Sequence, residues 1–164
     1  MKTRTKVIVS ALTVVGIAGF ALATPIVGLL SPILAAGNHS GDIQKTGMGP
    51  VTNGDRFRAE LNTDGPSTTT IQDAAYAFPG QNGWHSHPGL VSVTIISGSI
   101  EWFDANCVAT IYKAGDSWVE GSQLHAFRNL GPGTVHLMAW FITAQGQPLR
   151  TDETAPACAS GLGL

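Results

Sequence analysis

The sequence has few charged residues and no cluster of positive charge beyond its start. Charged residues make up 12% of the chain, and three of its nine Lys and Arg residues lie within the first six positions. The remaining six basic residues face eleven acidic ones, a balance of −5. Because there is no basic stripe, and the aromatic residues are not interleaved with positive charge, nucleic acid is not an expected partner.

Residues 56–148 lack a convincing helical pattern. Short segments rich in β-branched and aromatic residues alternate there with turn residues, and the chain's 20 glycines and nine prolines are scattered rather than periodic. A hydrophobic content of 43% is enough for a substantial core. We therefore expect a single all-β domain of about eight short strands, arranged as a sandwich or a small barrel.

The run from Val7 to Ala36 contains no charge and follows a basic start, as is typical of an export signal. Residues 1–37 are therefore predicted to be a signal peptide or a membrane anchor. Ala21-Leu22-Ala23 offers a small-x-small cleavage site, although cleavage there leaves an apolar tail. The alternative is an uncleaved membrane-spanning helix, which Pro25 and Pro32 would bend or end. We favour cleavage, and expect an exported protein that is secreted or held at the cell surface.

The rest of the chain divides by composition. Residues 38–55 are polar, glycine-rich and without periodicity, which predicts a flexible linker, and residues 149–164 form a C-terminal tail after the barrel. The only two cysteines are Cys107 and Cys158. In an oxidising compartment an even pair predicts a disulfide, which would staple the tail to the domain. The alternative is two free thiols or metal ligands.

Two histidines one residue apart, His85 and His87, follow a glycine turn. On an extended chain their side chains point the same way, about 7 Å apart. Neutral imidazole suits zinc, copper and iron, and a divalent ion usually takes three or four protein ligands. His125, on another short apolar segment, is the candidate third ligand, because a curled sheet can bring distant strands to one interior point. We predict a divalent transition metal, with Fe, Mn, Zn and Cu as candidates.

The histidine spacing over residues 69–144 resembles the two motifs of the cupin family, G-x5-H-x-H-x(3,4)-E-x6-G and G-x5-P-x-G-x2-H-x3-N. The matching residues are His85, His87 and Gly98, with Gly80 or Gly83 before them, and more loosely Gly115, His125 and Asn129. The resemblance implies a double-stranded β-helix of jelly-roll type, with a homodimer as a fair expectation.

The chain departs from this pattern at the residues between the histidines. Val91, or Ser92 at the longer spacing, stands where the family has a metal-binding glutamate, and Glu120 and Ser122 stand near the proline and second glycine of the second motif. The sequence thus resembles a three-histidine cupin without the usual carboxylate.

Four other residues are candidates for the pocket. Gln123 would share a face with His125 on a regular strand and replace the missing carboxylate, and Glu101 lies on a neighbouring hairpin strand. His136 lies in the last long strand, as a packed core residue or a pocket residue. Trp84, beside the histidine pair, packs in the core or borders a pocket for an aromatic or sugar-like ligand.

Two functions fit these residues. The first is an exported cupin-domain protein that binds a divalent metal through three histidines together with a small-molecule ligand of unknown identity. The second is a metal-dependent enzyme, resembling a cupin dioxygenase or an isomerase or hydrolase, that acts on a small organic substrate. The missing carboxylate and the lack of an obvious general acid or base favour the first.

Overall fold

The computed structural model of the chain describes residues 24–164, which form thirteen β-strands and one short 3₁₀ helix. The elements are β1 (Val27–Leu30), β2 (Ile33–His39), β3 (Ile43–Thr52), β4 (Asp55–Thr63), β5 (Ser67–Gln81), β6 (His85–Ser86), β7 (Leu90–Ser97), β8 (Ser99–Asp104), β9 (Ala109–Lys113), β10 (Ser117–Glu120), β11 (His125–Asn129), β12 (Val135–Ala144), β13 (Thr151–Asp152) and η1 (Ala157–Ala159). No helix within residues 24–164 has the length and apolar character needed to cross a membrane.

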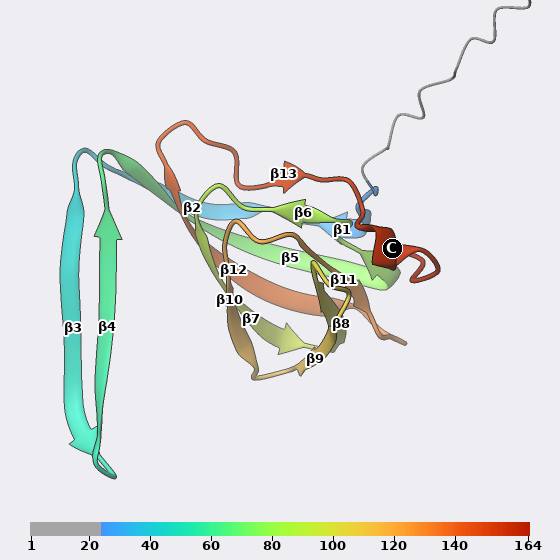
Figure 1. Ribbon diagram of the computed structural model, residues 1–164, viewed down its shortest axis with the longest axis horizontal. Coiled ribbons are helices and arrows are strands. Elements are labelled where there is room, and N and C mark those ends of the chain that lie inside the picture. Colours follow the sequence, from blue (N-terminus) through green and yellow to red (C-terminus); the bar gives the residue numbers. More distant parts are fainter. Residues whose placement is uncertain (1–23) are drawn as a thin grey trace, which may run out of the picture.

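The strands form a nearly closed antiparallel barrel (Figure 1). One wall runs in the order β2, β5, β12, β7, β10, and the other in the order β13, β6, β11, β8, β9. The long strand β5 joins the two walls, since its last residue, Gln81, pairs with Arg128 of β11. The structure confirms the predicted all-β jelly-roll fold.

Alternating residues of the central strands fill the barrel. In β7 the buried positions are Val91, Val93 and Ile95, while the residues between them face outward. The neighbouring strand β12 buries Leu137 and Phe141 in the same way. This period-two pattern is what a strand with one covered face requires.

The strands β1 and β2 lie in the segment that the sequence analysis assigns to a leader. Both pair with β5: Leu29 lies opposite Tyr76, and His39 lies opposite Ser67. An uncharged apolar run suits a strand as well as an export signal, so composition alone does not separate the two. Residues 1–23, which include the predicted cleavage site, lie outside the described residues.

The predicted linker, residues 38–55, contributes instead to a long hairpin. Strands β3 and β4 pair from Ile43 opposite Thr63 down to the turn at Asn53-Gly54, and the hairpin projects from the barrel (Figure 1). Both turn residues have positive φ, 53° and 88°, as a two-residue hairpin turn needs. The Asn-Gly turn organises a segment whose glycine content alone indicates an irregular chain.

The C-terminal tail is attached to the barrel by a disulfide, an apolar cluster and several hydrogen bonds. Cys107 and Cys158 form the predicted disulfide, with their Cα atoms 6.0 Å apart. Ala159 of η1 packs in a buried cluster with Trp84 and other apolar side chains. Arg128 Nη1 also donates a hydrogen bond to the backbone oxygen of Leu162, at 2.7 Å.

Breaking the disulfide should destabilise the protein. The bond closes a loop across a sequence separation of 51 residues, for which chain entropy gives up to about 4 kcal/mol. We expect the Cys107→Ser/Cys158→Ser variant to lose most of this free energy of unfolding in urea titrations. Each single serine variant should lose a similar amount, because either change breaks the bond. Unfolding midpoints equal to that of the oxidised wild type would contradict this.

Candidate metal centre

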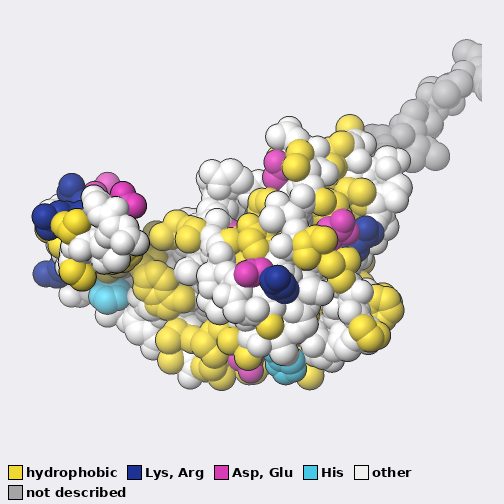
Figure 2. Space-filling view, turned by 90° about the horizontal axis from the view of Figure 1, so that it is seen from below, with side chains coloured by type: hydrophobic (Ala, Val, Ile, Leu, Met, Phe, Trp, Pro, Cys, Tyr) yellow, Lys and Arg dark blue, Asp and Glu magenta, His cyan; other side chains and the backbone are white. Residues whose placement is uncertain are grey.

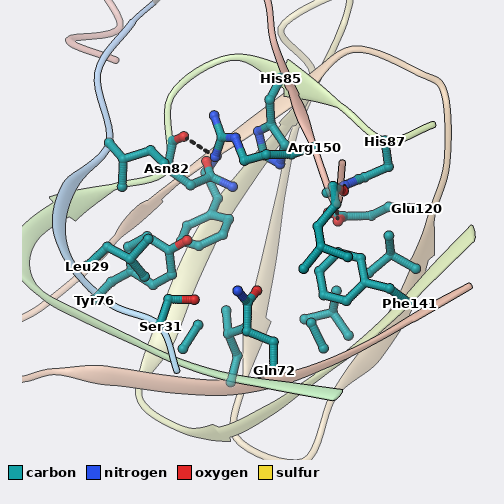
Figure 3. A pocket seen from close by; sticks show the side chains of 18 of the residues that line it. Leu29, Ser31, Gln72, Tyr76, Asn82, His85, His87, Glu120, Phe141 and Arg150 are labelled. Carbon is teal, nitrogen blue, oxygen red and sulfur yellow. Dashed lines mark hydrogen bonds and ion pairs between the residues drawn. The ribbon is translucent and has the colours of Figure 1, made fainter. Parts of the chain in front are cut away.

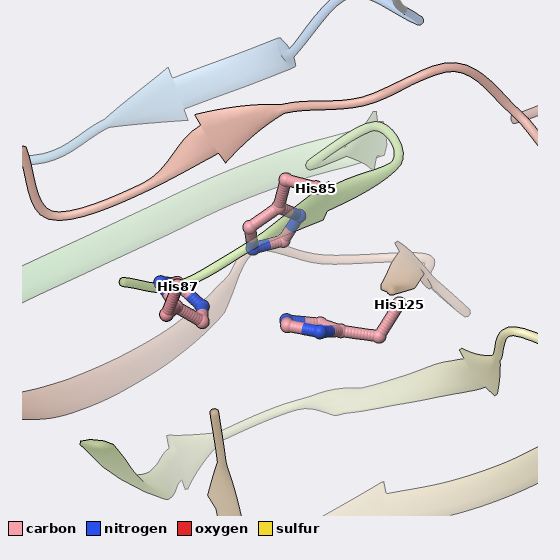
Figure 4. A group of neighbouring side chains, drawn as sticks. All are labelled: His85, His87 and His125. Atoms are coloured by element: carbon pink, nitrogen blue, oxygen red, sulfur yellow. The ribbon is translucent and has the colours of Figure 1, made fainter. Parts of the chain in front are cut away.

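The three predicted histidines meet inside the barrel, where two paired strands bring them together (Figure 4). His85 on β6 lies directly opposite His125 on β11, and His87 comes directly after β6. Their ligand nitrogens all lie within 4.8 Å of one another. The three residues are 3%, 1% and 5% exposed for His85, His125 and His87.

Glycines allow the chain to bring the histidine segment close to its neighbours. A Cβ atom on Gly83 would lie 2.3 Å from the backbone oxygen of Thr24, and its φ is +66°. A Cβ atom on Gly89 would lie 2.1 Å from the backbone oxygen of Ile142 in β12. The turns on both sides of the histidine pair therefore require glycine.

Each imidazole is held by a backbone carbonyl through Nδ1. His85 Nδ1 lies 2.9 Å from the oxygen of Gly83, and His125 Nδ1 lies 2.8 Å from that of Gln123. His87 Nδ1 lies 2.7 Å from the oxygen of Leu149, in the C-terminal segment. Since a carbonyl only accepts, each Nδ1 carries the proton, and each Nε2 of a neutral ring presents a lone pair.

The Nε2 atoms fit a metal ion. Those of His87 and His125 are buried and have no hydrogen-bond partner. Burial and, to a lesser extent, the nearby His125 lower the pKa of His85 to about 2, so this ring stays neutral. Neutral imidazoles with Nδ1 bonded to carbonyls and Nε2 unpartnered have the protonation state and orientation of metal ligands.

Glu120, at the end of β10, lies against this cluster, although the sequence analysis treats it only as a mismatch to the second motif. Its side chain is 6% exposed, and Oε2 lies 3.3 Å from Nε2 of both His87 and His125. Oε1 accepts hydrogen bonds from the indole nitrogens of Trp102 and Trp118, at 2.8 and 2.6 Å.

Glu120 remains ionised in this environment. Burial opposes its ionisation, but contacts with His125, His87 and the Trp118 indole outweigh burial and hold the pKa of Glu120 below its usual range. A sequence signal for its orientation exists in Ser117-Trp118-Val119-Glu120, where Glu120 shares a face with the buried Trp118. That pattern places Glu120 in the interior without indicating what it contacts.

A cavity of about 120 Å³ is lined by His85, His87 and Glu120 (Figure 3). Most of its wall is apolar. Its polar residues away from the histidines and Glu120 are Ser31, Gln72, Tyr76, Asn82 and Arg150. Arg150 donates from Nη1 to the Asn82 backbone oxygen at 2.9 Å and also pairs with Asp152. Burial raises the pKa of Tyr76 above its usual range, so its hydroxyl stays protonated.

The predicted carboxylate substitutes do not reach the cluster. Gln123 is exposed, because β11 begins at His125 and strand alternation does not extend back to Gln123. Its backbone oxygen, and not its side chain, contacts the site, through Nδ1 of His125. Glu101 lies opposite Arg128 in the β8 and β11 pair and forms an ion pair with it at 2.7 Å. Neither lines the cavity.

The other two candidates also lie away from the cavity. His136 is exposed, since the alternate residues Val135 and Leu137 of β12 face the interior. Trp84 is fully buried in an apolar cluster with Ala126 and Ala159 and does not line the cavity. Of its two predicted roles, packing in the core is therefore the one that the structure shows.

Comparison with solved structures shows which known fold this architecture resembles. A cupin-2 domain protein from Rhodospirillum rubrum matches with a TM-score of 0.53 at 12% sequence identity, over 81% of this chain and 74% of that one. The fold is that of the cupins. Oxalate decarboxylase from Bacillus subtilis, described with Mn(II) centres, matches with a TM-score of 0.44 at 18% identity over 51% of this chain and 23% of its own. Oxalate oxidase in complex with the substrate analogue glycolate matches with a TM-score of 0.45 at 17% sequence identity. This match covers 51% of this chain and 45% of that one.

The sequence itself matches no protein-family model and no curated protein.

Two other residues of the cupin-like motifs, Gly98 and Asn129, have structural roles. Gly98 has φ of +84° in the turn between β7 and β8, and a Cβ atom there would lie 2.6 Å from Val135. Asn129 Nδ2 donates to the backbone oxygens of Tyr76 and Gly133. These residues shape the barrel around the site rather than enter it.

Proposed function

We propose that this protein is an exported cupin-fold protein that binds a divalent transition metal through His85, His87 and His125, and a small organic molecule in the adjoining cavity. One observation carries the proposal: three buried imidazoles converge, each with Nδ1 bonded to a backbone carbonyl. Buried polar atoms are normally satisfied, and a metal ion satisfies the unpartnered Nε2 atoms.

The donor set suits Fe, Mn, Zn or Cu. Imidazole nitrogen is a common ligand of these ions, and a site with three protein nitrogens leaves room for water or an organic ligand. The ion would supply Lewis acidity or, for a redox-active metal, electron transfer. The chain's own residues hold it, and the wall of the cavity selects the molecule beside it.

The shape and chemistry of the cavity favour binding over catalysis. Its wall is mainly apolar, and its phenol, Tyr76, stays protonated, so it donates a hydrogen bond rather than acting as a base. Its carboxylate, Glu120, accepts from two indoles through Oε1 and faces the histidines through Oε2. The alternative is a metal-dependent enzyme, a dioxygenase or an isomerase or hydrolase, because the same cavity places an organic molecule beside the ion. The two functions differ in outcome: a binding protein releases the small molecule unchanged, whereas an enzyme converts it to product.

Metal content tests the central claim. Protein purified without added metal or nickel resin should carry close to one equivalent of a transition metal by mass spectrometry. The His85→Ala/His87→Ala variant should lose it, because two of three ligands are removed. His136→Ala is the matched control, since His136 is an exposed histidine on the outer face of β12. No metal in the folded wild type, even after addition of Mn²⁺, Fe²⁺, Zn²⁺ or Cu²⁺, would contradict the proposal.

Export with cleavage after Ala23 agrees with the position of the next residues. Thr24 Oγ1 accepts a hydrogen bond from the Trp84 amide at 2.7 Å, and β1 and β2 belong to the barrel sheet. Cleavage at this point would therefore leave no loose apolar tail. We expect the intact mass of the protein from the extracellular fraction to correspond to a chain beginning at Thr24. Full-length chain in the membrane fraction would instead indicate an anchor.

A homodimer is proposed from the exposed strand β2. Its seven residues carry no Asp, Glu, Lys or Arg, and its side chains are exposed, whereas charge gathers on the projecting hairpin (Figure 2). Among the strands of residues 24–164 it pairs only with β5. An uncharged open edge favours pairing with a second strand. Light scattering should give the mass of a dimer, and Leu34→Lys should convert it to monomer, while Ile96→Lys, at an exposed position on β7, should not. A monomeric wild type would contradict this.

A further inference from the structure

Glu120 occupies a specific place relative to the motif position Val91. In the antiparallel pair of β10 and β7, Glu120 lies directly opposite Val91. Paired residues share a face of the sheet, with Cβ atoms about 4.5–5.5 Å apart. Both residues line the cavity beside the histidines. A carboxylate on either strand therefore starts from nearly the same point on the barrel wall.

We propose that Glu120 is a fourth protein ligand of the metal, supplied by β10 from the position that faces Val91 on β7. This inference rests on the proposed metal binding by the three histidines. It concerns a residue that the histidine motifs do not include, and it follows from strand register and interatomic distances.

The distances from Glu120 Oε2 match those between ligands of one ion. Two ligand atoms about 2.1 Å from a common ion lie about 3.0 Å apart at right angles and about 3.4 Å apart at the tetrahedral angle. Oε2 lies 3.3 Å from Nε2 of His87 and 3.3 Å from Nε2 of His125. Each of these two distances therefore fits a pair of ligands of one ion.

Electrostatics also call for a cation at this point. The Nδ1 atoms of His87 and His125 donate to carbonyls, so a ring that carries only this proton presents the lone pair of its Nε2 towards the Oε2 atom of Glu120. Lone pairs and an anionic oxygen repel one another at 3.3 Å unless positive charge lies between them. A divalent ion supplies that charge to all three atoms at once.

Two tryptophans set the orientation of the carboxylate. Trp102 and Trp118 donate their indole hydrogens to Oε1, which leaves Oε2 facing the histidines. The Trp102 ring also stacks on His125, with centroids 5.8 Å apart and planes 21° apart. Glu120 is therefore fixed to bind through a single oxygen before an ion arrives.

A different role for Glu120 makes a different prediction. If Glu120 serves only as the counter-ion of a protonated His87 or His125, the metal displaces that proton and the loss of Glu120 leaves metal affinity unchanged or stronger. If Glu120 is a ligand, its loss weakens binding. Metal affinity, measured on folded protein, separates these roles.

The first experiment compares Glu120→Gln with the wild type and with Glu101→Gln, a matched control on the outer face of the barrel. Glutamine keeps an oxygen for the two indoles while removing the charge. Kd values for Mn²⁺, Co²⁺ and Zn²⁺ would be measured by competition with a chelating dye. We expect Glu120→Gln to bind at least about 100-fold more weakly, because loss of a direct ligand costs no less than the 10- to 100-fold that loss of an outer-shell partner costs, and Glu101→Gln to match the wild type. The absorption spectrum of bound Co²⁺ should also change in Glu120→Gln alone.

The second experiment moves the carboxylate from β10 to Val91 on the neighbouring strand β7. Val91→Glu/Glu120→Gln should recover affinity to within about tenfold of the wild type, because the new side chain enters the cavity from the opposite residue. Circular dichroism confirms that each variant is folded. A double variant as weak as Glu120→Gln would overturn the cross-strand equivalence.

The outcomes separate this inference from the proposed function. A wild type that binds no metal would refute the three-histidine site itself. A wild type that binds metal, with Glu120→Gln equal in affinity and Co²⁺ spectrum, would leave that site standing and refute Glu120 as a ligand.

Discussion

The hydrogen bonds from the three Nδ1 atoms to backbone carbonyls are the constraint on which the site depends. They fix the tautomer and the direction of each ring, and they come from three separate segments through Gly83, Gln123 and Leu149. Two of the acceptors lie two residues before the histidine they hold, so they are local to the turn. The third belongs to the C-terminal segment, and so links the site to the end of the chain.

The C-terminal segment that carries Leu149 is joined to the barrel by several further contacts. Strand β13 pairs with β6, placing Asp152 opposite His85, and the Glu153 amide donates to the Trp84 carbonyl. Trp84 in turn packs with Ala159, next to the disulfide at Cys158. The disulfide and the apolar cluster therefore restrain the segment that orients the histidines, and a covalent bond outside the cluster supports their geometry.

The sequence allowed the histidine cluster to be predicted because its signal is local. His85 and His87 share a face through simple alternation, and His125 falls in the strand that pairs with β6. For Gln123, alternation misled because its premise failed. Gln123 precedes the start of β11, and composition could not reveal that Asn53-Gly54 organises a hairpin in the predicted linker.

Glu120 shows what a motif cannot encode. A motif records spacing along one strand, whereas a site in a barrel is a point in space that residues of several strands can reach. Val91 and Glu120 are 29 positions apart in the chain yet directly opposite in the sheet, and their pairing follows from register, which depends on the turns and on the core. A missing carboxylate in a strand motif is therefore no indication that the site lacks one. The inward-facing residues of the paired strand are the place to search, and here a tryptophan at the neighbouring inward position, Trp118, holds the carboxylate that replaces it.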